Sequence, residues 1–483
     1  MEEVLNEQVV LDGKRVLVTL DSAAGVLQWR GERDGQLILQ NDLIGFCSSE
    51  SGICLYTFRM TKSSSYCGKG LPGRKRKDMV VEFSNDGARR LWCDSLQRIL
   101  DKAGRPKRLL VLVNPFGGRK TGRKVFSASV EPLLKAAGIT YTVKETQFQR
   151  HALDLAKESD LSQLDGIVCV SGDGVLVEVL NGLLERSDWE RAIKMPIGII
   201  PAGTGNGLAK SVLDHVGEPC DAASATFLVI RAGQTQPLDV ATAKQSNVKF
   251  HSILMLTWGL VADVDIESER LRWMGALRLD VYTLIRISNL RKYNGQLYYI
   301  PAPGYEGTGT PLNEEFARTT LMTSGEANSD SSLQKHGDPG SLQKNFSEWR
   351  EMEGPFILIW LNNVPFVSES VNAAPNAKFA DGYLDLIILK DCPRWALLNL
   401  LLKVQTGGHI KSKYVDYLKV KTFRLDPVGR HASDVQGGYT DLDGEILARD
   451  KGSFGDGSNY PMSYGPPIEV TVEPGLATIF CPP

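Results

Sequence analysis

Hydrophobic residues change their spacing twice along the chain, and the changes divide the sequence into three parts. In the first hundred residues, short strand-like runs are separated by turn residues, and one helical pattern at 85–100 ends the part. Between about 107 and 235, continuous apolar runs such as Leu109–Val113 alternate with helical stretches, which is typical of a parallel sheet buried on both faces. From 236 onward strand patterns return around one helical block at 267–292, so we expect a mostly antiparallel domain.

These patterns predict three domains. A β-rich domain is expected at 1–104, a three-layer α/β nucleotide-binding domain at 105–235, and a mostly antiparallel β-sandwich at 236–483. The segments 301–353 and 426–467 are polar and carry little periodicity, so we predict a disordered insert and a loop there. The strands and closing helix of the first part, with Trp92, resemble a pleckstrin-homology domain.

The stretch Arg59–Lys77 holds seven basic residues and no acidic one. Such a stretch could dock on anionic lipid head groups. The competing interpretation is a solvated basic loop, and the sequence favours it slightly.

Composition narrows the function. Of the 483 residues, 42% are hydrophobic and 23% are charged, and 55 Lys and Arg balance 57 Asp and Glu, which argues against a nucleic-acid binder that works by bulk positive charge. The eight cysteines show no Cys-x-x-Cys pair, so we expect reduced thiols and no zinc site. The N-terminus lacks a signal-peptide pattern and no apolar run approaches the roughly 18 residues of a membrane span. We therefore expect a cytoplasmic protein that meets a membrane only at its surface.

Three glycine-rich turns follow apolar strands in the α/β part, at Asn114–Lys120, Ser171–Gly174 and Pro201–Gly207. The carboxyl ends of parallel strands line the ligand-binding edge of such a sheet. Glycine lets backbone N–H groups approach phosphate oxygens there, and the following helix N-terminus favours an anion. The turns therefore predict a phosphate-bearing ligand, although neither the P-loop pattern nor the Gly-x-Gly-x-x-Gly dinucleotide pattern is present.

Asp173 lies between two glycines at the end of a predicted buried strand. A carboxylate there could accept a proton from a substrate hydroxyl or position a metal ion. It could equally cap the next helix, and the local sequence does not separate these alternatives. Glu178 follows in the predicted helix, where it could point toward the same edge or lie on the helix surface.

The three turns, as Val111–Gly118, Ser171–Glu178 and Pro201–Gly207, together resemble the catalytic domain of the diacylglycerol kinase superfamily. Within that superfamily, Trp258–Arg272 most resembles the sphingosine, or long-chain base, kinases. The resemblance covers about 107 to 300 and 354 to the end, and excludes the first hundred residues.

The resemblance implies a lipid kinase that transfers the γ-phosphoryl group of ATP, with Mg²⁺, to the primary hydroxyl of a sphingoid base held in the β-domain. It implies that Asp173 is the general base and that Asp265 recognises the amino-alcohol head. Phe116 stands where relatives often carry Arg, and Gln147–Gln149 replaces a more charged stretch. The implied substrate contacts are Ser171, Gly172, Asp173, Gly174 and Asp265. The implied nucleotide contacts are Asn114, Pro115, Phe116, Thr146, Gln147, Phe148, Gln149, Arg150, Ser171, Gly172, Glu178, Gly203, Thr204, Gly205, Arg272, Arg278, Asp443, Gly444 and Glu445.

Elementary chemistry agrees with this interpretation in part. A protonated amine favours a carboxylate, and on a strand Asp263 and Asp265 would share one face. Without the resemblance we would favour a solvated acidic turn. Arginines at 270, 272 and 278 could neutralise a triphosphate.

The stretch Leu277–Tyr293 predicts a basic amphipathic helix with an apolar stripe that includes Leu277, Val281, Leu284 and Ile285. The stripe could face the core, which is the commoner case, or it could contact a membrane, gate lipid entry or bind calmodulin. A homodimer is also left open.

Two other functions remain open at this point. A diacylglycerol or ceramide kinase of the same superfamily would act on a substrate without a free amine. A lipid-binding adaptor with an inactive kinase half would rely on the N-terminal domain, and the intact Ser171–Gly174 turn argues against it.

Overall fold

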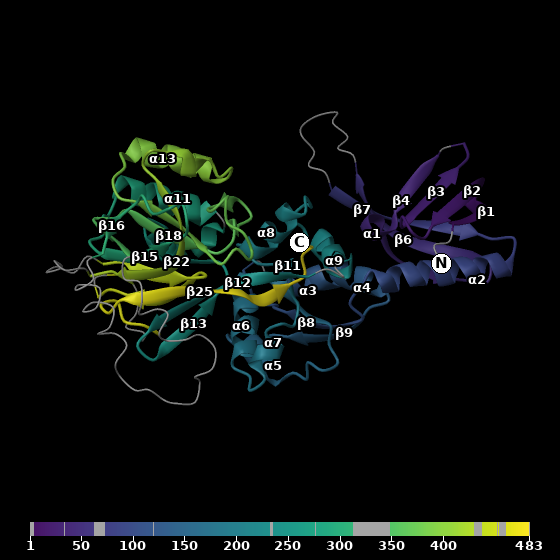
Figure 1. The fold of residues 1–483 in the computed structure, drawn as a ribbon, viewed down its shortest axis with the longest axis horizontal. Helices are drawn as coiled ribbons and strands as arrows, with labels where there is room; N and C mark the ends of the chain where they lie inside the picture. The colour runs from purple at the N-terminus through teal and green to yellow at the C-terminus, as the bar shows by residue number, and fades with distance from the viewer. Residues whose placement is uncertain are drawn as a thin grey trace. The chain divides into compact units, whose positions relative to one another are not determined.

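The computed structural model describes residues 4–32, 34–61, 73–118, 120–231, 235–275, 277–312, 348–428, 437–451, 453 and 460–482 (Figure 1). The side chain of Arg272 lies outside this description. The chain divides into two compact units, Met1–Gln236 with Thr478–Pro483, and Pro237–Ala477. Among the described helices, none combines the length and the apolar character that crossing a membrane requires.

The first unit begins with a seven-stranded antiparallel sheet in the order β4-β3-β2-β1-β7-β6-β5, which confirms the predicted β-rich region. Helix α2 (Asp86–Lys102) follows it, and the side chain of Asn85 caps this helix by accepting a hydrogen bond from the Gly87 N–H at 2.8 Å. Trp92 and Leu96 of α2 are buried in the core of this sheet. The other elements are β1 (Val4–Leu11), β2 (Lys14–Asp21), β3 (Val26–Arg30), β4 (Gly35–Ile38), α1 (Leu39–Asp42), β5 (Leu43–Ser48), β6 (Gly52–Thr61) and β7 (Gly73–Glu82).

Residues 62–72 of the basic stretch lie outside the described residues, and two basic residues after them are already paired. Arg74 forms an ion pair with Glu218 at 2.6 Å, and both side chains are almost fully buried. Arg76 pairs with Asp78 at 2.9 Å. Part of the predicted lipid-binding stretch therefore serves internal contacts.

The rest of the first unit is a layer of four parallel strands in the order β11-β10-β8-β9. The residues of β10 are buried throughout, as expected for a strand covered on both faces. The strands are β8 (Arg108–Val113), β9 (Thr140–Glu145), β10 (Gly166–Ser171) and β11 (Ile197–Pro201). The helices are α3 (Gly122–Val125), which continues through a π-turn at Phe126–Val130 into α4 (Glu131–Ala136), α5 (His151–Glu158), α6 (Asp173–Leu184), α7 (Trp189–Ala192), α8 (Gly207–His215) and α9 (Ala222–Arg231).

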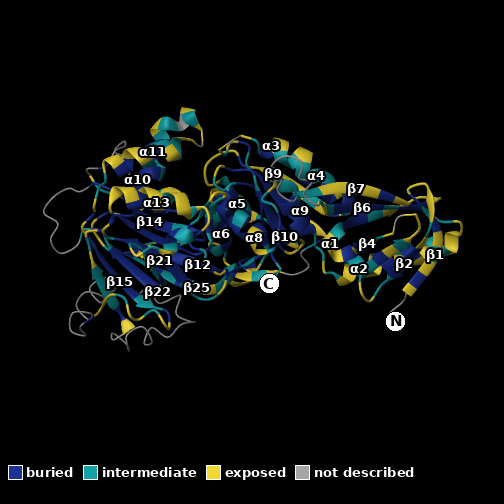
Figure 2. Ribbon diagram, turned by 90° about the horizontal axis from the view of Figure 1, so that it is seen from above, coloured by how far each residue is buried: buried dark blue, intermediate teal, exposed yellow. Residues whose placement is uncertain are grey.

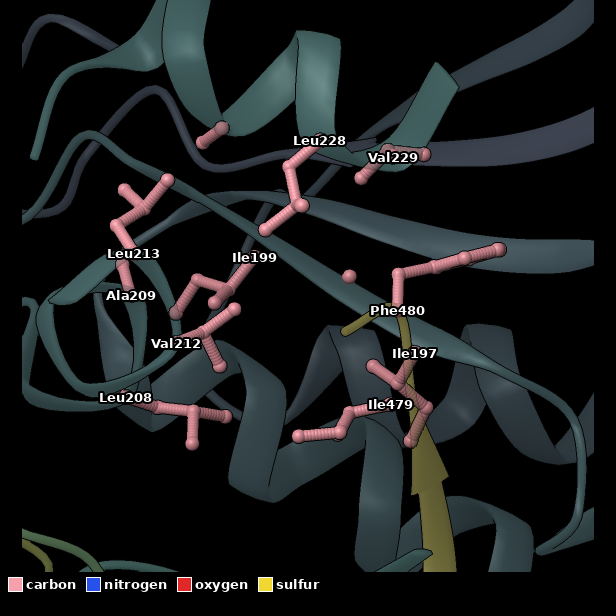
Figure 3. A pocket seen from close by; sticks show the side chains of 12 residues that line it. Ile197, Ile199, Leu208, Ala209, Val212, Leu213, Leu228, Val229, Ile479 and Phe480 are labelled. Atoms are coloured by element: carbon pink, nitrogen blue, oxygen red, sulfur yellow. The ribbon is translucent and has the colours of Figure 1, made fainter. Parts of the chain in front are cut away.

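An apolar pocket lies beside β11 in this unit, and Figure 3 shows the aliphatic side chains and Phe480 that surround it. Its lining comes from β11, α8, α9 and the chain end at Ile479 and Phe480. Its free volume of about 10 Å³ is no more than one water molecule needs. It is therefore a packing defect rather than a ligand site.

The second unit is built on antiparallel strands in the order β24-β23-β14-β18-β21-β22-β25. One face of these strands encloses a large core around Trp258, Tyr299 and Phe356. The other face carries Trp360 and Ile387, which pack against α10, α11 and α13. The strands are β12 (Gln236–Gln245), β13 (Val248–Ser252), β14 (Met255–Gly259), β15 (Gln296–Pro301), β16 (Thr310–Pro311), β17 (Arg350–Glu353), β18 (Leu358–Asn362), β19 (Phe366–Ser368), β20 (Val371–Asn372), β21 (Leu384–Leu389), β22 (Asp416–Asp426), β23 (Tyr439–Leu442), β24 (Glu445–Arg449) and β25 (Ile468–Ile479).

The helical part of this unit begins earlier than predicted. Helix α10 spans Leu260–Glu267, a 3₁₀ segment follows at Ser268–Met274, and α11 spans Leu277–Ser288. Gly275 has a positive φ of 61°, which only glycine adopts at low cost, and it separates the 3₁₀ segment from α11. Two further helices lie at Arg394–Val404 (α13) and, as one 3₁₀ turn, at Gly408–Lys411.

Two segments predicted to be without regular structure are partly ordered, so those predictions were wrong at these positions. In 301–353, β16 and β17 extend the sheet beside β15, while 313–347 lies outside the described residues. In 426–467, strands β23 and β24 form a hairpin with an Asp443-Gly444 turn whose two residues have φ of 53° and 88°. An Asp-Gly turn of that geometry matches the twist of a hairpin. The polar composition of 426–467 therefore masked the Asp443-Gly444 dipeptide, which is a typical hairpin turn sequence.

Candidate functional site

The three glycine-rich turns lie together at the carboxyl edge of the parallel layer. The Asn114 N–H, after β8, donates to the carbonyl of Val170 in β10 at 3.1 Å. The Ala202 N–H, after β11, donates to the carbonyl of Ser171 at 3.0 Å. Because β8, β10 and β11 are neighbours in the sheet, the turns that follow them form one continuous patch of backbone.

Glycine is required where these turns touch. A Cβ on Gly118 would lie 2.2 Å from Oγ1 of Thr204, and one on Gly203 would lie 2.4 Å from Cα of Gly172. Real Cβ atoms do not approach other atoms this closely, so any side chain would push the turns apart. The three turns therefore converge, as expected for the ends of neighbouring parallel strands, and the N–H groups of such turns suit phosphate oxygens.

Asp173 is the first residue of α6 and is buried, at 8% exposure. Its carboxylate accepts hydrogen bonds from the N–H groups of Gly207 at 2.8 Å and Leu208 at 3.0 Å, at the start of α8. It therefore caps a helix that begins 34 residues later, as well as lying in the middle of the three turns. A carboxylate has about four acceptor sites, so these two hydrogen bonds do not exhaust it.

Asn114 and Asn206 hold the first and third turns in shape. Oδ1 of Asn114 accepts from the N–H groups of Phe116 at 2.9 Å and Gly117 at 3.0 Å. Asn206 has a left-handed φ of 57°, and its Oδ1 accepts from the Gly203 N–H at 2.9 Å. Both side chains order the loop backbone, which is how a short polar side chain stabilises a turn.

Glu178 does not project freely toward the turns. Its two carboxylate oxygens accept from the N–H groups of Arg150 at 3.0 Å and Ala152 at 3.1 Å, so it caps α5. Burial raises the pKa of Glu178, and the backbone donors oppose that shift. Its structural role is thus to anchor the loop 146–150 that precedes α5, and the nucleotide role implied by the resemblance stays a prediction.

Two aromatic side chains near these turns are exposed. Phe116 is 62% exposed and Phe148 is 58% exposed. The ring of Phe148 stacks on His151 with centroids 4.5 Å apart, and the Gln147 N–H donates to Nδ1 of His151 at 3.0 Å. Flat apolar surfaces of this kind suit a nucleobase.

In the second unit, Asp263 belongs to a buried ion network. Oδ2 of Asp263 accepts from Arg286 at 3.1 Å and from the hydroxyl of Tyr293, and Glu267 accepts from Tyr282 at 2.7 Å and Arg291 at 3.1 Å. Burial raises the pKa of Asp263 to about 6, while Tyr293 and Arg286 favour its ionised form. The network joins α10 to α11, so Asp263 is a structural residue.

Asp265 lies on a different face of α10 from Asp263. The assumption that both acids sit on a strand was wrong, because residues two apart on a helix point about 200° apart. Burial raises the pKa of Asp265 to about 6, and the nearby positive charge of Arg278 opposes the shift. Arg278 itself donates to Glu269 at 2.7 Å.

The hairpin turn between β23 and β24 lies beside Asp265, since a Cβ on Gly444 would be 3.9 Å from its Oδ2. Asp443 in this turn accepts from the hydroxyl of Ser252 at 2.7 Å and from the N–H groups of Met255 at 2.8 Å and Leu254 at 3.1 Å. Asp443 therefore fixes the start of β14, and of the triplet only Glu445 has an exposed side chain.

Sequence reasoning missed Asp441, two residues before this turn. Asp441 is fully buried on β23, and among the described residues neither of its carboxylate oxygens has a hydrogen-bond partner. Burial raises its pKa well above the usual value, and the neighbouring carboxylates of Asp265, Asp443 and Glu445 raise it further. The alternating residues before an Asp-Gly turn could have revealed the strand, but not the burial of its acid.

The structure thus gathers the predicted residues into two groups, one in each compact unit. The turn residues, Asp173 and the 146–150 loop lie in the first, and Asp265, Arg278 and the Asp443-Gly444-Glu445 turn lie in the second. Within the parts of the chain that are described, no three His, Cys, Asp or Glu side chains gather as a metal site.

Comparisons with known proteins agree with this division. Residues 108–243 match the diacylglycerol kinase catalytic domain, and residues 255–454 match the YegS C-terminal NAD kinase beta sandwich-like domain. Sphingosine kinase 1 of Arabidopsis thaliana is 46% identical over 99% of this chain and 96% of its own. Sphingosine kinase 2 of that plant is 46% identical over 99% and 98%. A solved structure of a putative diacylglycerol kinase from Bacillus anthracis shares the fold, with a TM-score of 0.50 and 20% identity over 78% of this chain and 96% of its own.

Proposed function

Because the chain belongs to the sphingosine kinase family, we propose that it transfers the γ-phosphoryl group of ATP to the primary hydroxyl of sphingoid long-chain bases. The products are the 1-phosphates of these bases and ADP. The observation that carries the proposal is the convergence of three glycine turns around the carboxylate of Asp173.

Phosphoryl transfer depends on positioning and charge neutralisation more than on covalent chemistry by the protein. The backbone N–H groups of the three turns and the N-terminus of α6 supply fixed partial positive charge for phosphate oxygens. Asp173 is held rigidly by α8, so it can orient the acceptor hydroxyl and take its proton as the new oxygen–phosphorus bond forms.

The described residues are compatible with Mg²⁺ that is bound mainly through the phosphates of ATP. Among the described residues, no three His, Cys, Asp or Glu side chains lie close enough together to enclose the ion. Mg²⁺ usually keeps several waters and binds through substrate phosphates with one or two carboxylates. We propose that it enters with ATP and that it neutralises charge on the phosphates.

The direct test is phosphorylation of a panel of lipids with radiolabelled ATP. We expect sphingosine, dihydrosphingosine and phytosphingosine to be phosphorylated, and ceramide and diacylglycerol to be poor substrates because they lack a free amine. Preferential phosphorylation of diacylglycerol or ceramide would assign the chain to the other activity of the superfamily. Binding of lipid without any phosphorylation would favour the adaptor interpretation.

Asp265→Asn should raise KM for sphingoid bases while leaving KM for ATP unchanged. We propose that Asp265 binds the protonated amine, and a hydrogen bond to a charged group is worth roughly 10- to 100-fold in affinity. Steady-state kinetics with dihydrosphingosine measure the change. Asp280→Asn is the matched control, because Asp280 is an exposed acid in the first turn of α11. Equal KM values in wild type and Asp265→Asn would contradict the amine contact.

We further propose that the second unit meets a membrane through α11 and α13. The apolar stripe of α11 does not face the core as its commoner interpretation held, since Leu277 is 63% and Leu284 is 54% exposed. Figure 2 shows exposed positions on both α11 and α13. On α13, Trp395 is 70% and Leu402 is 73% exposed. Exposed aliphatic and Trp side chains with basic neighbours are typical of helices that lie in a membrane interface.

Leu284→Ser with Leu402→Ser should reduce binding to vesicles of phosphatidylserine and phosphatidylcholine about tenfold, since each loses buried apolar area. Vesicle sedimentation measures the change, and Val4→Ser, at an exposed position of the first unit, is the control. Unchanged vesicle binding would contradict the membrane role. Loss of calcium-dependent calmodulin binding by the same variant would instead assign the stripe to that partner.

A further inference from the structure

The carboxyl group of Asp441, in the second unit, is buried without a hydrogen-bond partner among the described residues. The Gly444 N–H directs partial positive charge toward it without reaching hydrogen-bond geometry. A buried ionised carboxylate without donors is strongly unfavourable, so Asp441 would ionise only with a ligand that supplies donors or charge.

The strand register shows on which face of the sheet the side chain of Asp441 lies. In the strand register Asp441 lies opposite Thr257, and Thr257 lies opposite Trp360. Side chains of directly opposite residues share a face, so Asp441 lies on the face where Trp360 packs against α10, α11 and α13. Asp441 therefore lies at the edge of a layer whose centre, around Trp360 and Ile387, is apolar.

A second carboxylate stands next to it. Helix α10 packs on β23, and the negative charge of Asp265 acts directly on Asp441. Thr257 does not compete for Asp441, because its hydroxyl donates to the carbonyl of Ile359 at 3.3 Å. Two adjacent carboxylates beside an apolar layer match an amphiphile whose head carries both an ammonium group and hydroxyl donors.

We propose that Asp441 is a second substrate-binding residue, which accepts hydrogen bonds from the ammonium or chain hydroxyl of a 2-amino-1,3-diol head while Asp265 holds the charge. This inference rests on the proposed function for the identity of the lipid. It adds a specificity determinant, because a head group without a cation would leave the buried carboxyl group of Asp441 and the half-buried one of Asp265 next to each other without a positive charge.

The test compares Asp441→Asn with Thr440→Val in the full chain. Thr440 is the adjacent buried residue of β23 and points to the opposite face, opposite Trp258. We expect Asp441→Asn to weaken binding of a fluorescent sphingoid base about 10- to 100-fold and to raise its KM similarly. KM for ATP should stay within about twofold, and Thr440→Val should bind the base like wild type.

A thermal readout separates binding from structure. Without lipid, Asp441→Asn should melt at the same or a higher temperature than wild type, because a carboxyl group whose pKa burial raises costs folding free energy at neutral pH, whereas an amide does not titrate. A lower Tm together with unchanged base affinity would show that Asp441 is structural and overturn the inference. An increased Mg²⁺ requirement with unchanged base affinity would overturn it in favour of a metal ligand.

These experiments distinguish a failure of the inference about Asp441 from a failure of the proposed kinase activity. If wild type binds the fluorescent base without phosphorylating it, the proposed kinase activity fails, while loss of binding in Asp441→Asn still supports the second carboxylate. If wild type phosphorylates the base and Asp441→Asn behaves identically, only the inference about Asp441 fails. The N-acetylated base serves as the probe without an ammonium group, and the ratio of its affinity to that of the free base should rise in Asp441→Asn.

Discussion

Replacing Asp173 with Asn is expected to lower kcat by about 10²- to 10⁴-fold, the usual range for loss of a positioned base. The amide cannot take the proton of the acceptor hydroxyl, whereas the glycine turns that would bind phosphate are formed by other residues. KM for ATP should therefore change little. Initial-rate measurements with dihydrosphingosine and nucleotide-binding titrations measure the two effects separately.

The same substitution also disturbs a helix cap, so it needs a structural control. Asn can accept a hydrogen bond only through Oδ1, and its amide would face one of the two N–H donors of α8. We expect this to cost about 1 kcal/mol of stability. Ser211→Ala removes another hydrogen bond at the same helix, from Ser211 to the carbonyl of Gly207 at 2.9 Å, without touching the carboxylate.

The two variants decide between the alternatives that the local sequence left open. If Asp173 only caps α8, both variants should lose stability and keep most of their turnover. If Asp173 also handles the hydroxyl proton, only Asp173→Asn should lose turnover at a temperature where both are folded. Substantial activity in folded Asp173→Asn would remove it from the reaction.

The glycine turns could be predicted from the sequence because their signal is local. An apolar run followed by glycine marks a strand end, and neighbouring parallel strands bring such ends together. The hydrogen bonds of Asp173 and Glu178 could not be predicted, because their partners lie 34 and 28 residues away. Both carboxylates turned out to cap helices, which is a tertiary arrangement with no fixed sequence spacing.

Around Asp263 and Asp265, by contrast, the local sequence pattern does not determine the secondary structure. Asp263-Val-Asp265 reads equally well as a strand with both acids on one face or as a helix with the acids apart. The helix places Asp263 against Arg286 and leaves Asp265 beside Gly444, nearly 180 residues later. Only the fold distinguishes the structural acid from the candidate binding acid.

Glu218→Gln should destabilise the first unit by about 3 to 5 kcal/mol, because breaking a buried ion pair leaves an uncompensated charge. Arg74 donates to both oxygens of Glu218, at 2.6 and 2.7 Å, and Arg231 donates to Glu218 at 3.2 Å. Glutamine would leave two buried guanidinium groups next to each other. Since Arg74 comes from β7 and Glu218 follows α8, the N-terminal sheet should separate from the α/β layer before the layer itself unfolds.

Limited proteolysis between the N-terminal sheet and β8, together with calorimetric Tm, measures this separation. Glu185→Gln is the matched control, since Glu185 forms an exposed ion pair with Lys157 at 2.8 Å that is worth at most about 1 kcal/mol. Replacing Arg74 by Met, Glu218 by Leu and Arg231 by Met together should recover much of the loss, because apolar side chains remove all three charges at once. If Glu218→Gln and Glu185→Gln both melt like wild type, the buried ion pair does not hold the N-terminal sheet. The cation–π contact of Arg74 with Phe227, at 4.8 Å, would then be the next contact to remove.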